Sequence, residues 1–249
     1  CSDLFDGRMT GTKGMENANQ FVAQELNSFG LSPWQSNSWV QKFSFLKKFT
    51  VDKSSFLKIE AQENIICNLD SDWTPMNFSE NGKLFFHEIC FAGYGLQIKP
   101  DSNSDGYDSY THLDVANKWV MVLDGLPPHI TDTSVINYFS NPTHKASLAR
   151  NLGAQGIIFV NLDNNDTIKQ IATNVDHSLT IKSFVLNREV ASLLFRSNGR
   201  KLRTEIEKFS NPEPVLGFIL KNFNVTGDIQ IKKERGECHN TLGWLKSGK

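Results

Sequence analysis

A histidine and an aspartate two residues apart, His112 and Asp114, are the residues of this chain whose types and spacing most suggest metal chemistry. An imidazole nitrogen and a carboxylate oxygen both bind zinc, and zinc hydrolases use such ligands to activate water. Those enzymes also need further carboxylate ligands and a glutamate base, yet the chain contains no Glu-Glu pair. The triplet follows a polar stretch rather than a buried strand. The sequence therefore favours a loop-to-strand junction over a metal site.

Other potential metal ligands are isolated along the chain. Cys238 and His239 are adjacent, but no second pair lies at a spacing typical of zinc sites, so a strand entry is the favoured interpretation. The cysteines, which form no C-x-x-C motif, are Cys1, Cys67, Cys90 and Cys238. A Cys67–Cys90 disulfide and two buried free thiols both remain open, with the free thiols favoured. The other histidines are scattered in sequence: His87, His129, His144 and His177.

Motifs for a nucleophile or a phosphate group are also missing. The chain has no G-x-S-x-G elbow, and the glycines of segment 7–14, GRMTGTKG, lack the spacing of a phosphate loop. Thr10 and Thr12 in that segment suit a turn and the N-cap of a following helix. Segment 91–96, FAGYGL, could border a ligand groove, but its glycines favour close packing. The sequence assigns no catalytic, cofactor-binding or metal-ligating residue.

Hydrophobic periodicity predicts the elements that would position any such residues. Apolar side chains recur at helical spacing over residues 15–29. A short helix is expected over 145–152, followed by an unalternating apolar strand over 156–160, which is typical of a parallel sheet. A second strand and helix are predicted at 183–186 and 188–197. Further strands are expected at 39–46, 56–59, 83–92, 118–123, 215–223, 228–232 and 240–245.

The order of these elements predicts an α/β fold of the mixed α+β kind, with helices packed on a mixed sheet. Residues 1–48 and 233–249 are expected to form a different layer from the middle of the chain, and the polar segment 99–114 a surface loop. The formal net charge of -1 argues against a nucleic-acid-binding surface. No window reaches the roughly 18 to 20 apolar residues that a membrane-spanning helix needs.

The two ends of the chain together resemble a known family. GRMTG at 7–11, an amphipathic helix, and FGLSP at 29–33 resemble the start of bacterial zinc-dependent aminopeptidases related to aminopeptidase Y and glutamate carboxypeptidase. The closing HNTLGWLKSG at 239–248 resembles the strand by which such chains re-enter the peptidase body. The matching positions near the start are Gly7, Arg8, Thr10, Gly11, Phe29, Gly30, Leu31 and Pro33.

The middle of the chain resembles the protease-associated domain that these peptidases carry as an insertion. The similar segments are 91–96, 107–128 and 145–160. The resemblance implies that 1–48 is the N-terminal helix and strand of a truncated peptidase body. The resemblance also implies that 49–232 is the inserted domain, a mixed sheet or barrel flanked by helices. Residues 233–249 would then be the re-entry strand of the peptidase body.

The resemblance also implies what the chain lacks. It assigns His112 and Asp114 to the inserted domain, away from the catalytic H-x-D, and maps no zinc ligand or glutamate base onto the chain. Two zinc ions are expected in a catalytic domain that follows, and no cofactor in the chain itself. The implied partners are that domain and a peptide or protein substrate, with no nucleic acid.

The implied function is that of a non-catalytic accessory portion of a zinc aminopeptidase, shaping substrate access or protein contacts. A free-standing peptide- or protein-binding module is the alternative. A periplasmic or secreted location is implied, and Cys1 would carry a lipid if it were the mature start of a bacterial lipoprotein; an artificial start explains Cys1 equally well. The sequons, which matter only in a eukaryotic secretory pathway, lie at Asn77, Asn165 and Asn224.

One structural expectation follows from the idea of an accessory portion. If residues 1–48 normally pack on a peptidase body, the apolar stripe of the first helix should be partly uncovered in this chain. Burial of Phe21, Val22 and Leu26 within the chain would count against that idea.

Overall fold

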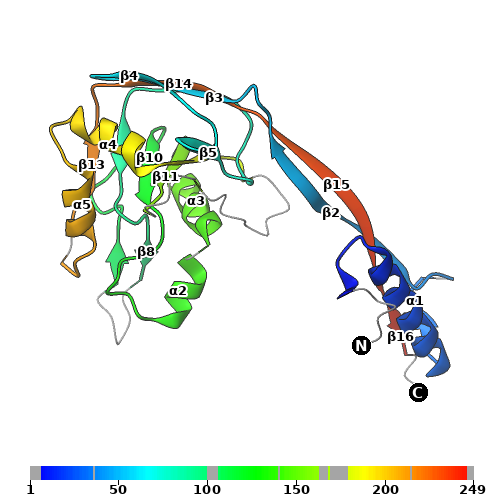
Figure 1. Cartoon of the computed structure of the whole chain (residues 1–249). Coiled ribbons are helices and arrows are strands. Elements are labelled where there is room, and N and C mark those ends of the chain that lie inside the picture. Colours follow the sequence, from blue (N-terminus) through cyan, green and yellow to red (C-terminus); the bar gives the residue numbers. More distant parts are fainter. Residues whose placement is uncertain are drawn as a thin grey trace. The chain divides into compact units, whose positions relative to one another are not determined.

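The computed structural model describes residues 7–35, 37–99, 106–139, 141–162, 168, 179–213 and 215–245. The chain divides into two compact units (Figure 1). The terminal unit comprises Cys1–Thr50 with Lys232–Lys249, and the central unit comprises Val51–Ile231. The assignment of 49–232 as an inserted protease-associated domain stays a prediction.

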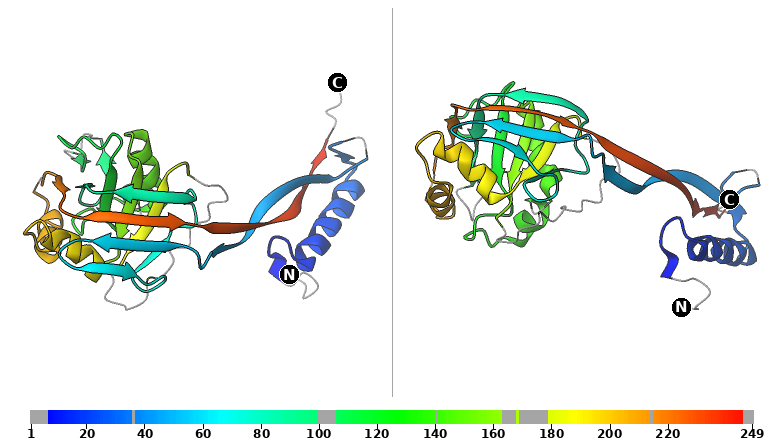
Figure 2. Two further views of the ribbon diagram at one scale, coloured as in Figure 1. Left: turned by 90° about the horizontal axis from the view of Figure 1, so that it is seen from above. Right: turned by 45° about the horizontal axis from the view of Figure 1, so that its top comes forward.

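The terminal unit consists of one helix and strands from both ends of the chain. Helix α1 (Lys13–Ser28) begins at Thr12, whose hydroxyl accepts a hydrogen bond from the Met15 amide at 3.4 Å. Strands β2 (Val40–Val51) and β15 (Ile231–Thr241) pair along their length (Figures 1 and 2). Two short strands, β1 (Ser32–Pro33) and β16 (Gly243–Trp244), form a second antiparallel pair.

Helix α1 is attached to the rest of the terminal unit through its small and polar residues. Gly14, Ala18 and Asn19 are its buried residues. The Asn19 amide donates to the His239 carbonyl at 2.9 Å, and the Thr241 hydroxyl donates to the Asn19 carbonyl at 3.2 Å. These bonds attach the first half of the helix to β15.

The larger apolar side chains of this helix are uncovered. Phe21 is 50% exposed, Val22 is 41% exposed, and Phe29 at the C-cap is 70% exposed. Leu26 is half-buried. The expected exposure of the apolar stripe is therefore observed.

A six-stranded mixed sheet forms the centre of the central unit, in the order β13-β7-β10-β11-β12-β5. The four inner strands are parallel and the two outer strands are antiparallel to their neighbours. The bounds are β5 Trp73–Pro75, β7 Ile89–Phe91, β10 Trp119–Leu123, β11 Gly156–Val160, β12 Lys182–Leu186 and β13 Phe218–Leu220. Every residue of β11 is buried. The predicted α/β fold and the parallel strand at 156–160 are confirmed.

The two faces of this sheet are covered by different layers. Cys90 and Ala92 of β7 share a core cluster with Ala146 and Ala149 of helix α3 (Pro142–Asn151). Phe91, between them, points to the opposite face, where its ring centroid lies 5.0 Å from that of Phe195 and 5.2 Å from that of Phe209. Those two rings belong to helices α4 (Arg188–Arg196) and α5 (Leu202–Phe209).

A four-stranded antiparallel sheet, ordered β4-β3-β14-β6, packs on the same side as α4. The contact is made by Phe86 of β6, whose ring stacks on Trp119 of β10 at 4.4 Å between centroids. The bounds are β3 Phe56–Glu60, β4 Asn64–Cys67, β6 Gly82–Phe86 and β14 Asn224–Ile229. Figure 2 shows this sheet lying across the strands of the larger one.

Several predicted strands are wrong. The expected single strand 83–92 is two strands in two sheets, because the chain leaves β6 after Phe86 and enters β7 at Ile89. Only Phe218–Leu220 of the expected strand 215–223 pairs with a neighbour. The expected strand 228–232 spans a junction at Gln230, where β14 ends and β15 begins.

Several further elements lie outside the predictions, among them the short strands β1, β4 and β5. Helix α2 (Thr133–Phe139) precedes α3, and α5 follows α4; neither α2 nor α5 was expected from periodicity. The polar segment 99–114, expected to be a loop, contains the strand β9 (Tyr107–Asp108), which pairs with β8 (Gln97–Ile98).

Among the described helices, none is long and apolar enough to cross a bilayer.

Candidate functional site

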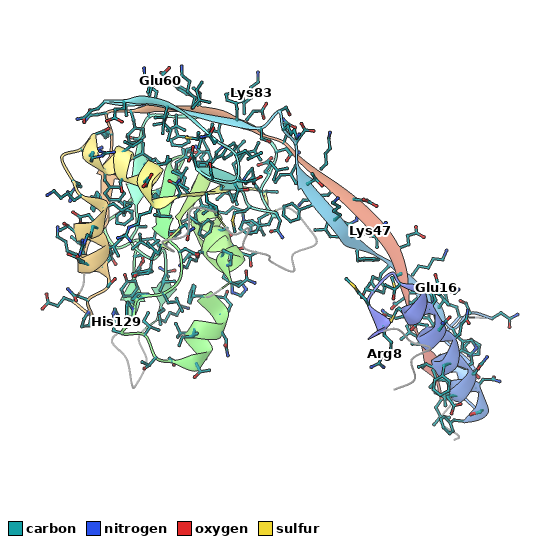
Figure 3. The ribbon with its side chains drawn as sticks, in the orientation of Figure 1. Arg8, Glu16, Lys47, Glu60, Lys83 and His129 are labelled. Atoms are coloured by element: carbon teal, nitrogen blue, oxygen red, sulfur yellow. The ribbon has the colours of Figure 1, made fainter. Side chains whose placement is uncertain are left out.

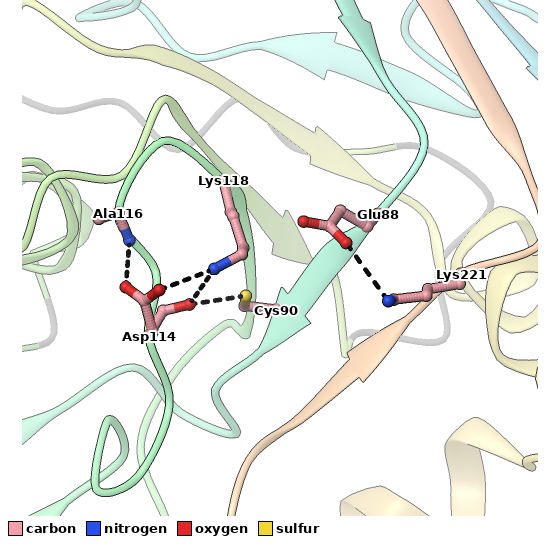
Figure 4. A network of polar contacts seen from close by, with 6 residues as sticks. All are labelled: Glu88, Cys90, Asp114, Ala116, Lys118 and Lys221. Carbon is pink, nitrogen blue, oxygen red and sulfur yellow. Dashed lines mark hydrogen bonds and ion pairs between the residues drawn. The ribbon is translucent and has the colours of Figure 1, made fainter.

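The His112–Asp114 triplet lies in an exposed loop of the central unit. His112 adopts a positive φ of 60°, and both side chains are exposed. The Asp114 carboxylate accepts hydrogen bonds from the Lys118 ammonium at 3.0 Å and from the Ala116 amide at 3.1 Å (Figure 4). These bonds, led by that from Lys118, hold the Asp114 pKa below its usual value. His112 and Asp114 thus belong to a turn before β10, in agreement with the favoured interpretation of a loop-to-strand junction.

A second ion pair lies near this turn in Figure 4, where Lys221 approaches Glu88 at 3.7 Å. No group of three or more His, Cys, Asp or Glu side chains that could hold a metal ion occurs among the described residues. Cys238 is buried, and His239 contributes its backbone carbonyl to Asn19. The described residues thus do not fit a zinc centre.

The described cysteines are buried free thiols: Cys67, Cys90 and Cys238. Burial raises the pKa of the Cys67 thiol to about 12 and that of the Cys90 thiol to about 11. The Cys90 thiol donates to the Asp114 carbonyl at 3.6 Å. Such protonated, inaccessible thiols are poor nucleophiles and poor metal ligands. Cys1 lies outside the described residues.

The remaining described histidines do not converge. The His87 ring lies 6.4 Å from the ring of Phe85, and the His144 ring stacks on that of Tyr138 at 3.8 Å. His129 lies near Tyr107, with 6.3 Å between ring centroids. His177 and the sequon at Asn165 lie outside the described residues. Of the other sequons, Asn77 is buried and Asn224 is exposed.

Segment 91–96, FAGYGL, is buried throughout. Gly93 and Gly95 both have positive φ, and a Cβ on Gly95 would come within 2.5 Å of the Val122 side chain. Its glycines therefore serve close packing, as favoured from the sequence. A hollow begins immediately after this segment, at the β8–β9 hairpin.

We call this hollow the hairpin groove, and it is the candidate functional site. It has a volume of about 480 Å³. That volume falls within the usual range for small-molecule and short-peptide sites. Its lining includes Ile98, Lys99, Tyr107, Thr111, Val215 and Leu216. The sequence allowed a ligand groove at segment 91–96, as the less favoured interpretation, but did not identify these lining residues. The two walls lie more than a hundred residues apart in the chain.

Hydrogen bonds fix the hairpin that forms one wall. Ser109 accepts from the Leu96 amide at 2.9 Å through its hydroxyl and donates its own amide to the Leu96 carbonyl at 2.8 Å. The Asp108 carboxylate accepts from the Gln97 amide group at 3.1 Å and from the Tyr110 backbone amide at 2.8 Å. Both oxygens of Asp108 are thus engaged within the hairpin.

A chain of contacts connects the hairpin to the end of α5, next to the other wall. The Tyr107 ring lies against His129, labelled in Figure 3. The His129 Nδ1 group donates to the Ser210 carbonyl at 3.3 Å, and the Ser210 hydroxyl lies 3.0 Å from the Tyr94 hydroxyl. Burial raises the Tyr107 pKa, so this phenol stays neutral at physiological pH.

Lys145, a buried lysine of α3, was not identified from the sequence. Its side chain is buried, with Nζ donating to the Leu123 carbonyl at 3.1 Å and to the Gly125 carbonyl at 2.5 Å. The ammonium also lies 5.9 Å from the centre of the Tyr94 ring. Burial lowers the Lys145 pKa to about 8, against an opposing effect of Asp124. Lys145 thus binds the backbone carbonyls at the carboxyl end of β10 from the interior of the central unit.

Comparison with known proteins gives structural neighbours only. No protein-family model and no curated protein matches the chain. One similar solved structure is an aminopeptidase from Aneurinibacillus sp. strain AM-1, at 14% identity and a TM-score of 0.43 over 95% of this chain and 45% of that one. A zinc aminopeptidase from Bacillus subtilis aligns at 15% identity and a TM-score of 0.43, over 97% and 44% of the two chains.

A third neighbour is a peptidase M28 precursor from Shewanella amazonensis SB2B, at 10% identity and a TM-score of 0.34, over 96% of this chain and 48% of that one. The chain spans less than half the length of each of these three proteins. At such identities and TM-scores, the likeness carries no argument about activity.

Proposed function

We propose that this chain is the accessory portion of a zinc-dependent aminopeptidase. The terminal unit belongs to the peptidase body, and the central unit is a protease-associated domain that shapes substrate access or protein contacts. Hydrolysis of the N-terminal peptide bond, with its two zinc ions, belongs to a catalytic domain beyond Lys249. No residue of this chain has a catalytic or metal-binding role in the proposal. An exported location, periplasmic or secreted, belongs to the same proposal.

The observation that carries the proposal is the uncovered apolar face of α1, which we call the α1 face: Phe21, Val22 and Phe29. These side chains are substantially exposed, although Gly14 and Ala18 of the same helix are buried. Contiguous exposed apolar side chains mark a surface that another body covers. The sequence segments around this helix, 7–11 and 29–33, are those that resemble the start of an aminopeptidase.

The test compares this chain with a form of the protein that continues past Lys249. Zinc content and hydrolysis of a panel of aminoacyl-nitroanilides are measured on both. We expect zinc and turnover in the longer form only. Zinc and turnover in the present chain would overturn the proposal and return attention to His112 and Asp114. A longer form that binds no zinc and hydrolyses no substrate would also overturn it.

A free-standing peptide- or protein-binding module is the second candidate function. The hairpin groove favours it, because a preformed hollow with apolar and charged walls suits a short peptide and needs no attached enzyme. The two functions differ in the test above, since a binding module shows no turnover in either form. They also differ at the α1 face, which a free-standing module has no reason to keep uncovered.

A further inference from the structure

We propose that the hairpin groove binds an extended peptide at its C-terminus, with the terminal carboxylate at Lys99 and an apolar side chain against Leu216. The groove belongs to the central unit alone. The inference therefore does not rest on the attached peptidase, and it holds equally for an accessory domain and for a free-standing module.

Aliphatic side chains form the apolar wall of the groove. Val215 and Leu216 face the hollow from the segment that follows α5, and Ile98 from β8. Leu216 is 57% exposed. An apolar side chain that covers it removes this surface from water, which is favourable by about 25 cal/mol per Å².

The Lys99 ammonium indicates that the ligand also carries a negatively charged group. Lys99 is exposed, and no ion pair joins it to any residue in the part of the chain that the structure describes. Asp108, a carboxylate in the same lining, has both oxygens engaged by Gln97 and by the Tyr110 amide. Asp108 keeps its negative charge, but its hydrogen bonds are directed to the hairpin and not to Lys99. The Lys99 ammonium can therefore pair with a carboxylate of the ligand, and such a charge-assisted bond is stronger than a neutral one.

The described parts of the two walls are held together by contacts that need no ligand. Hydrogen bonds hold β8 to β9, and the Tyr107–His129–Ser210 contacts hold the hairpin to the end of α5. A site whose walls are already fixed loses less conformational entropy when it binds. Weak but specific recognition of a short segment is the expected result.

Polar groups in the lining favour a peptide over a simple fatty acid, which also combines a carboxylate with apolar atoms. Thr111 and Gln97 line the groove among the apolar residues. Backbone groups of a peptide can hydrogen-bond to the Thr111 hydroxyl, whereas an alkyl chain could offer that hydroxyl no hydrogen bond in place of water.

The probe is the tripeptide acetyl-Ala-Leu-Phe with a free carboxylate, titrated into the full chain by isothermal titration calorimetry. Its C-terminal amide and octanoate are titrated in the same way. We expect binding in the micromolar to millimolar range for the acid and roughly fivefold weaker binding for the amide, since one exposed ion pair contributes up to about a factor of five. Octanoate should bind more weakly than the acid peptide.

Two variants test the charged part and the apolar part of the groove separately. Lys99→Gln should weaken the acid by roughly fivefold without changing the amide, and Leu216→Ser should weaken both peptides. The matched controls are Lys53→Gln, an exposed lysine elsewhere in the central unit, and Ile66→Ser, an exposed apolar residue on β4; neither should change binding.

The inference is overturned if the acid and the amide bind equally, if Lys99→Gln leaves the acid unchanged, or if neither peptide binds at millimolar concentration. Tighter binding of octanoate than of the acid peptide would also overturn it, in favour of a fatty acid site. Because the readout is binding to this chain alone, any of these results leaves the aminopeptidase proposal untouched. Conversely, an inactive longer form leaves the groove untouched.

Discussion

At the scale of single residues, Lys145 is a lysine whose side chain is buried in the central unit. It is only 1% exposed, and its ammonium binds two backbone carbonyls at the end of β10. A buried charge is costly unless it is hydrogen-bonded, and these two carbonyls supply the partners. The residue therefore ties α3 to the chain that leaves β10.

The lowered pKa of Lys145 predicts a pH dependence of stability. Its pKa is about 8 in the folded chain and ordinarily 10.5. Between these values the unfolded state binds more protons than the folded state, so this group's contribution to the unfolding free energy rises with pH. Relative to a Lys145→Met variant, the native chain should gain about 2 kcal/mol between pH 7.5 and 9.5.

Urea denaturation of both proteins at several pH values within this range measures that difference. The cysteine thiols, which titrate near their usual pKa of about 8.5 once the chain is unfolded, are shared by the two proteins and cancel in the comparison. Lys53→Met, at an exposed position, is the control and should keep the slope of the native chain. Parallel pH profiles for the native chain and Lys145→Met would mean that Lys145 is charged throughout.

At the scale of elements, Gly156 shows how tightly β11 is packed against its neighbours. A Cβ on Gly156 would lie 2.5 Å from the Trp119 ring, which is itself stacked on Phe86. Trp119 is opposite Gly156 in the parallel ladder, so the missing side chain makes room for the indole. The glycine is thus required by a close approach within the sheet.

Gly156→Ala should lower the unfolding free energy by about 1 to 3 kcal/mol, because overpacking a core without room forces its neighbours to shift. In a Trp119→Leu background the same substitution should cost at least about 1 kcal/mol less, since the clashing ring is gone. Urea denaturation of the four proteins in this cycle measures both quantities. Additive effects would show that the indole is not what the alanine displaces.

The elements differ in how far the sequence determines them. The unit of α3 and β11 was predictable because a helical pattern, a glycine and an unalternating apolar run follow one another. The strand expected at 83–92 was wrong because nothing in its composition marks the change of sheet between Phe86 and Ile89. Helix α5 was missed because its apolar residues, such as Leu202 and Phe209, are few among charged ones.

The candidate site was even less predictable from the sequence. The hairpin groove is formed by two-residue strands and by a segment more than a hundred residues away, and strands of that length have no detectable periodicity. Lys145 was missed because its charge suggests a solvent-facing position, whereas its burial depends on carbonyls that only the tertiary fold provides. The turn at His112–Asp114, a local feature, was predicted correctly.

At the scale of the whole molecule, the terminal and central units differ in how well they bury their apolar residues. Each strand of the parallel core in the central unit is buried on both faces, as β10 and β11 show. In the terminal unit, β2 has no buried residue. Large apolar side chains are exposed there, including Trp244 as well as Phe21 and Val22 of α1. The terminal unit by itself therefore has little core of its own.

Substitutions in the α1 face separate an accessory portion from a self-sufficient module. Phe21→Lys should change the unfolding free energy of this chain by less than about 0.5 kcal/mol, because the side chain is already half exposed. In a form of the protein that continues past Lys249, the same change should cost about 2 kcal/mol, because a covered phenylalanine would be replaced by a charge. Because exposed apolar side chains favour self-association, we expect the present chain to self-associate and Phe21→Lys to reduce this, as measured by sedimentation velocity.

Gln24→Lys is the matched control, since it adds the same charge at an exposed polar position of the same helix. It should leave both stabilities and the self-association unchanged. If Phe21→Lys has the same small effect in the longer form as in this chain, then no other part of the protein covers the α1 face. The terminal unit would then have to be explained as part of a binding module, and the hairpin groove would remain as the site that gives such a module its ligand.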